Sequence, residues 1–139
     1  MDQLSQFVSH HGLLVLAFVV MLLIIALYEY FMLKSQGKTI STAQAIEQIN
    51  HFSAMVIDLR AAEMFKKGHI IGAMRATTAD FKLPKIQQYK EKPVILVCSR
   101  GVESQEASKL LRAQGFTHVM VLAGGIAAWQ AAHLPLVKK

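Results

Sequence analysis

The sequence predicts a small α/β domain with a central parallel sheet flanked by helices, preceded by one N-terminal transmembrane helix. Short apolar runs alternate with stretches of helical periodicity, which is typical of a parallel sheet buried on both faces. A long apolar stretch at 12–33 predicts the membrane helix. Asp58 and Cys98 directly follow predicted strands, so we expect both at the carboxyl edge of the sheet, where ligands bind in such folds.

The predicted membrane helix, residues 12–33, includes one charged residue, Glu29. A helix of this length spans about 33 Å, against about 30 Å for the hydrocarbon core of a bilayer. Glu29 lies between Tyr28 and Tyr30 near one end. We therefore interpret it as an interfacial side chain, with an intramembrane functional carboxylate as the alternative. A cleaved signal peptide is disfavoured, because residues 1–11 contain no Lys or Arg and no small-x-small site follows the apolar run.

Charge asymmetry predicts the orientation of this helix. All 15 Lys and Arg residues lie at or after position 34. By the positive-inside rule, we expect a single-pass protein of the cell inner membrane with its N-terminus outside and its C-terminal domain in the cytoplasm. The chain accordingly divides into an N-terminal flank at 1–11, the span at 12–33, a linker at 34–38 and the folded domain at 39–139.

Composition limits the partners that we expect. The net charge of +6 fits an anionic lipid surface or an anionic substrate. Nucleic acid is not expected, because the basic residues are scattered and no recognised binding motif accompanies them. We expect no cofactor and no metal ion, since the adjacent His10 and His11 lack further ligands nearby. The single cysteine, Cys98, cannot form an internal disulfide, which suits a reducing compartment.

The domain is expected to alternate helices with short strands. Helices are predicted at 42–50 with Ser41 or Thr42 as N-cap, at 61–67 closed by Gly68, at 80–89 broken by Pro84, at 104–113 and at 126–132. Strands are predicted at 55–57, 94–97 and 119–122, and residues 70–76 are expected to combine a loop with a short strand.

The strongest pointer to function is the turn that runs from Cys98 to Ser104 into a predicted helix. N–H groups and the helix dipole at a helix N-terminus stabilise an anion bound there. Gly101 permits a turn closed to other residues, Arg100 adds a cation, and Ser104 is expected to cap the helix. A thiolate in this turn is a nucleophile for an anionic sulfur or phosphorus centre. The alternative is a cysteine that only fills the core.

Three segments, in order along the chain, resemble the rhodanese family of sulfurtransferases. The turn from Cys98 to Glu103 resembles the active-site loop of the family. Residues 56–73 resemble its "D-x-R, E-F-x-x-G-H-I-x-G-A" stretch, and residues 121–129 resemble its "L-x-G-G-x-x-A-W" close. The positions that match the first stretch are Asp58, Arg60, Glu63, Phe65, Gly68, His69, Ile70, Gly72 and Ala73. The resemblance covers about residues 38–136 and implies a small α/β domain with a central parallel sheet.

The resemblance also implies transfer of a sulfane sulfur. The Cys98 thiolate would attack the outer sulfur of a donor such as thiosulfate, expel sulfite, and pass the sulfur of its persulfide to cyanide or a thiol. Asp58 and Arg60 are expected to support the site as an ion pair. The loop residues expected to bind the small anionic donor are Ser99, Arg100, Gly101, Val102, Glu103 and Ser104. The loop has the sulfurtransferase length, whereas related phosphatases have one residue more.

The chain departs from the family pattern at two positions. Glu103 stands where many active members have Arg, and Arg75 stands where the family often has Asn. A carboxylate directed into the loop would repel an anionic donor. A second hypothesis therefore stays open, in which the domain is a non-catalytic module that binds protein partners, such as a membrane protein, at the inner membrane.

Overall fold

The computed structural model describes residues 6, 10–35 and 37–138. The chain forms two compact units, Met1–Ser35 and Gln36–Lys139. Most of the predicted flank at 1–11 lies outside the described residues, as does Gln36 in the predicted linker.

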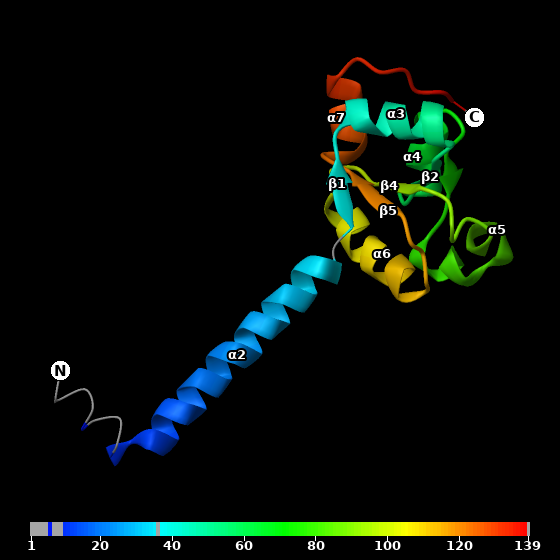
Figure 1. Cartoon of the computed structure of the whole chain (residues 1–139). Helices are drawn as coiled ribbons and strands as arrows, with labels where there is room; N and C mark the ends of the chain where they lie inside the picture. The colour runs from blue at the N-terminus through cyan, green and yellow to red at the C-terminus, as the bar shows by residue number, and fades with distance from the viewer. Residues whose placement is uncertain (1–5, 7–9, 36, 139) are drawn as a thin grey trace. The chain divides into compact units, whose positions relative to one another are not determined.

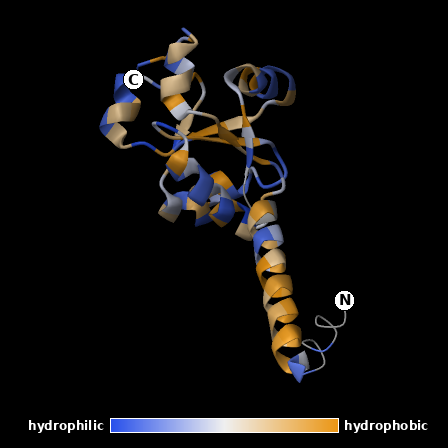
Figure 2. Ribbon diagram, turned by 90° about the vertical axis from the view of Figure 1, so that its left-hand side faces the viewer, coloured by the Kyte–Doolittle hydropathy of each residue, from blue (hydrophilic) through white to orange (hydrophobic). Residues whose placement is uncertain are grey.

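Helix α2 (Gly12–Ser35) contains the predicted span. Its residues Gly12–Leu33 have a mean hydropathy of 2.6 and are long and apolar enough to cross a membrane. Large apolar side chains along it, such as Leu13 and Phe31, are exposed, and Figure 2 shows hydrophobic colouring over most of its length. The predicted helix is confirmed, while its insertion in a membrane stays a prediction.

Five parallel strands form the centre of the second unit, in the order β1-β5-β4-β2-β3 (Figure 1). The strands are β1 (Lys38–Ile40), β2 (Met55–Asp58), β3 (Met74–Arg75), β4 (Val94–Val97) and β5 (Val119–Leu122). All four residues of the central strand β4 are buried, because helices cover both faces of the sheet. The predicted parallel sheet is therefore confirmed.

Alternating side chains of the strands build two hydrophobic cores, one on each face of the sheet. In β4, Ile95 and Val97 belong to the core that includes side chains of α3 (Thr42–Phe52) and α7 (Gly125–Ala131). Val94 and Leu96 belong to the other core. Its further side chains come from η1 (Thr78–Lys82), α5 (Pro84–Gln87) and α6 (Val102–Ala113). Helix α4 (Ala62–Lys67) follows β2.

Two predicted helices show how local sequence sets their ends. The helix predicted at 42–50 is α3, and Ser41 caps it with a reciprocal pair of hydrogen bonds to Gln44. The segment predicted as a broken helix at 80–89 forms the 3-10 helix η1 and the short α5. Pro84 is the first residue of α5, where its missing N–H costs no helical hydrogen bond.

The structure differs from the prediction at the expected linker, 34–38. Helix α2 extends through Ser35, and Lys38 already begins β1, which pairs with β5. β1 has three residues, of which one, Ile40, is buried. No apolar run therefore marks this strand in the sequence, and its extended conformation depends on the pairing with β5.

Candidate active site

Cys98 lies directly after β4, at the carboxyl edge of the sheet. In the neighbouring strand β2, Asp58 lies opposite Val97, so Asp58 and Cys98 share this edge, as predicted. The Cys98 side chain is buried, and its Sγ accepts a hydrogen bond of 3.0 Å from the N–H of Gly101. A donor directed at sulfur stabilises negative charge on it. The loop thus closes on the thiol through its own backbone.

Gly101 gives the loop its shape. Its φ of 95° lies in the left-handed region, which favours glycine. A Cβ at this position would approach the backbone N of Gly124 to 3.2 Å. Gly101 therefore serves both the turn and the close contact between the loop and the segment after β5.

The first turn of α7 fixes the loop from its other side. The N–H of Ile126 donates to the Cys98 carbonyl at 2.9 Å, and the N–H of Ala127 donates to the Ser99 carbonyl at 3.1 Å. This approach requires glycine at position 125, because a Cβ there would lie 2.9 Å from the backbone N of Arg100, and φ is 57°. Gly125 therefore allows the first turn of α7 to lie in direct contact with the Cys98 loop.

Asp58 and Arg60 form the predicted ion pair. Arg60 Nη2 lies 2.8 Å from Asp58 Oδ2, and Arg60 Nε donates to Asp58 Oδ1 at 3.0 Å. The same Nη2 donates to the Gly68 carbonyl at 2.7 Å. Both side chains are buried. Buried charges are costly unless they are paired and hydrogen-bonded, and these contacts meet that requirement. The pair holds the end of α4 against the carboxyl edge of the sheet.

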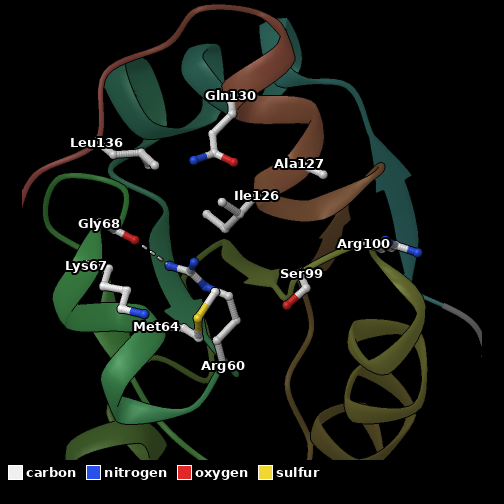
Figure 3. Close-up of a pocket in the computed structure, with 10 residues that line it drawn as sticks. All are labelled: Arg60, Met64, Lys67, Gly68, Ser99, Arg100, Ile126, Ala127, Gln130 and Leu136. Carbon is white, nitrogen blue, oxygen red and sulfur yellow. Dashed lines mark hydrogen bonds between the residues drawn. The ribbon is translucent and has the colours of Figure 1, made fainter.

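A pocket of about 400 Å³ lies beside the loop. The residues that line it are Arg60, Met64, Lys67, Gly68, Ser99, Arg100, Ile126, Ala127, Gln130 and Leu136. Figure 3 shows the Arg60 and Lys67 side chains near Met64, with Ser99 from the loop and Ile126 and Gln130 from α7 around them. Arg60 is already paired with Asp58, so Lys67 and Arg100 supply the positive charge of the lining. Together with the apolar groups, they fit a small anion that carries a soft or apolar part.

The Arg100 side chain, which was expected to add a cation to the Cys98 loop, is directed into solvent. It is exposed, and Figure 3 shows it directed away from Arg60. Arg100 also lines a second pocket of about 450 Å³, together with Thr39, Gly101 and Val102. It therefore lines both pockets.

Helix α6 begins at Val102, two residues before the predicted start, so Ser104 does not cap it. The N-cap is Gly101, and Ser104 is fully buried in the first turn, with its Oγ unpartnered among the described residues. Val102 and Glu103 are exposed. The earlier start has a physical reason, because Glu103 in the first turn interacts favourably with the helix dipole.

Several residues that line the pocket beside the Cys98 loop were not predicted from the sequence. Met64 and Lys67 come from α4, Gln130 comes from α7, and Leu136 comes from the C-terminal segment. The sequence did contain one indication of the α7 residues. Gly124 and Gly125 follow β5, and in a parallel sheet the residues after β5 lie at the same carboxyl edge as Cys98. That edge relation places the start of α7 beside the loop.

The fold and this loop define a known class of domain. A family model for the rhodanese-like domain matches residues 41–132, which is most of the chain. The chain belongs to the rhodanese-like domain family. The resemblance drawn from three short motifs is therefore confirmed for the family.

The chain is similar to individual proteins of known sequence or structure. The uncharacterized protein YibN of Escherichia coli (strain K12) is 35% identical, over 99% of this chain and 99% of its own length. The thiosulfate sulfurtransferase GlpE of Pseudoalteromonas translucida (strain TAC 125) is 32% identical, over 73% of this chain and 97% of its own. A crystal structure of a rhodanese-related protein from Thermoplasma volcanium matches with a TM-score of 0.64 and 22% identity, over 73% of this chain and 99% of that one.

Proposed function

We propose that this chain is a sulfurtransferase that carries a sulfane sulfur as a persulfide on Cys98. One observation carries the proposal: the Cys98 Sγ accepts a hydrogen bond from Gly101 N–H inside a loop beside a cation-lined pocket. The similarity to a protein named thiosulfate sulfurtransferase supports the same reaction class. Thiosulfate is therefore the first donor to test.

The first half-reaction is an attack of the Cys98 thiolate on the outer sulfur of thiosulfate. A new S–S bond forms to Sγ while the S–S bond of thiosulfate breaks, and the bonding electron pair leaves with sulfite. The loop supplies N–H donors, and the first N–H groups of α6 have no partner within the helix. Such donors stabilise the negative charge of the donor and of the departing sulfite.

The second half-reaction returns the thiol to its starting state. Cyanide or a thiolate attacks the terminal sulfur of the persulfide, and the electron pair of the S–S bond returns to Sγ. Ser99, Arg60 and Lys67 line the pocket through which an acceptor would approach. The cationic lining favours an anionic acceptor.

The direct test is turnover of thiosulfate and cyanide to thiocyanate by the purified full chain in detergent. We expect saturable turnover with both substrates. Absence of both turnover and a persulfide would overturn the enzymatic proposal and leave the partner-binding module as the remaining hypothesis.

Glu103→Arg is expected to raise kcat/KM for thiosulfate. The substitution changes the charge at the start of α6 by two units toward positive. In a water-like dielectric, this change in charge stabilises a bound anionic donor by about 1 kcal/mol, which corresponds to a roughly fivefold higher kcat/KM. Steady-state kinetics at low ionic strength measure the change.

Glu47→Arg is the matched control for this substitution, because Glu47 is an exposed residue of α3 and the change in charge is the same. We expect kcat/KM close to that of the unmodified chain. Equal effects of both substitutions, or no gain from Glu103→Arg, would contradict a local role of Glu103.

We further propose that α2 anchors the domain in the inner membrane, with the domain in the cytoplasm. Support comes from the apolar length of Gly12–Leu33 and from the absence of Lys and Arg before position 34 in the sequence. The anchored arrangement leaves room for a membrane protein partner as acceptor or donor. A cytoplasmic location also keeps the thiol reduced.

Reporter fusions after Lys139 test this topology. We expect a fluorescent protein to fluoresce there, and alkaline phosphatase to stay inactive because its disulfides do not form in a reducing compartment. Active alkaline phosphatase at this position would contradict the proposed orientation. Release of the chain from membranes by alkaline washing would contradict the proposed membrane anchor.

A further inference from the structure

A third pocket, lined by basic residues, lies at the amino edge of the sheet, opposite the edge that carries Cys98. Its volume is about 460 Å³. It lies at the amino ends of β1, β4 and β5 and beside the C-terminal ends of α3 and α6. The residues that line it are Lys38, Gln48, Phe52, Glu91, Pro93, Arg112, Thr117, His118, Val119 and Met120.

The lining of this pocket is basic and includes an exposed aromatic ring. Lys38 and Arg112 carry positive charge and His118 adds an imidazole, against the single acid Glu91. Phe52 is 56% exposed at the end of α3. Basic groups beside an exposed aromatic ring are the combination that binds a bilayer surface, where the cations meet phosphates and the ring lies among headgroups.

One lining residue of this pocket, Lys38, is close in sequence to the proposed span. Lys38 is the first residue of β1 and follows Leu33, the last residue of the apolar stretch, by five positions. Five residues reach at most about 18 Å, even when fully extended. Lys38 is therefore tethered within a short reach of the membrane surface, whatever the orientation of the domain.

We propose that this amino edge binds anionic phospholipid headgroups through Lys38, Arg112 and His118. The inference rests on the proposed membrane anchor and adds a defined face to it. The carboxyl edge with Cys98 then faces the cytoplasm, separated from the lipid-binding edge by the length of the strands, about 13 Å. The sulfur acceptor would accordingly reach Cys98 from the aqueous side.

Hydrogen exchange of the full chain in nanodiscs tests the proposal. One set of discs contains phosphatidylcholine alone, and the other contains equal parts of phosphatidylcholine and phosphatidylglycerol. In the anionic discs we expect roughly threefold slower amide exchange at 48–53 and 112–118, with unchanged exchange at 98–103. Equal exchange in both discs at all three segments would overturn the proposal.

Charge reversal locates the effect. Lys38→Glu with Arg112→Glu is expected to remove the protection in anionic discs. Lys82→Glu with Lys85→Glu makes the same change in net charge at two exposed residues of η1 and α5, and is expected to keep the protection. Lys38→Glu alone, at an exposed residue, is expected to remove at least half of the protection and covers the case in which Arg112→Glu disturbs folding.

Further outcomes separate the competing sources of the effect. Loss of protection in both double variants would show attraction by net charge alone and would overturn a defined site. Equal protection by inorganic phosphate in phosphatidylcholine discs would assign the pocket to a free anion instead of a lipid. Failure of the chain to stay with the discs would sink the anchor, while thiocyanate production in detergent tests the sulfurtransferase proposal separately.

Discussion

Cys98→Ser is expected to abolish sulfur transfer while leaving the fold intact. Serine is close to cysteine in size, and the Gly101 N–H that donates to Sγ would donate to its hydroxyl instead. A hydroxyl cannot form the persulfide, so turnover should fall by about 10⁴-fold or to background, as for other enzymes that lose their nucleophile. Thiocyanate production by the purified full chain measures this loss.

The control for this variant is thermal unfolding. Cys98 is buried, and serine places a polar hydroxyl there, so we expect a loss of about 1–3 kcal/mol in the free energy of unfolding. Substantial thiocyanate production by a folded Cys98→Ser chain would show that another group carries the sulfur, and would contradict the assignment of the nucleophile.

Gly125→Ala is expected to damage the loop through its support. The added Cβ would meet the carbonyl oxygen of Cys98 and lie 2.9 Å from the backbone N of Arg100. The φ of 57° adds a conformational cost for any residue with a Cβ. These neighbours are backbone atoms, so they cannot move aside by a change of rotamer. We expect a loss of about 2–4 kcal/mol in the free energy of unfolding. Turnover is expected to fall by about tenfold or more, since the reacting atoms would be displaced.

Gly72→Ala is the matched control for this substitution. Gly72 also has a positive φ, 76°, but a Cβ there would meet nothing within 4 Å. We expect it to cost about 1 kcal/mol through the backbone conformation alone, with turnover unchanged. If both variants lose stability and turnover equally, the close contact between α7 and the loop is not what Gly125 serves. Chemical denaturation and steady-state kinetics on both chains decide this.

The buried strands are the part of the fold that the sequence predicts best. Residues 94–97 and 119–122 are predicted and observed with the same ends, because both strands are buried along their whole length and read as apolar runs. The capping of α3 by Ser41 is likewise local chemistry. The positions of Asp58 and Cys98 directly after predicted strands indicated that both lie at the carboxyl edge of the sheet, and the register of β2 with β4 confirms that they share it.

The features that the sequence could not predict depend on contacts between distant segments. β1 is extended because it pairs with β5, which lies some eighty residues further on (Lys38 with Met120). The pocket beside the Cys98 loop combines side chains of α4, the loop itself, α7 and Leu136. These segments meet only after the strands have paired. The start of α6 at Val102 was missed because Ser104 is a good N-cap residue by type, whereas Gly101 is the N-cap in the folded loop.

The mass of the peptide that contains Cys98 shows whether this residue carries a sulfane sulfur. The full chain is incubated with thiosulfate, alkylated to trap persulfides, and digested for mass spectrometry, with Cys98→Ser as the blank. We expect a Cys98 peptide that is heavier by one sulfur atom, and we expect the unmodified thiol when cyanide is added before alkylation. An unmodified Cys98 peptide without added cyanide, and in chain isolated directly from cells, would contradict this role of Cys98.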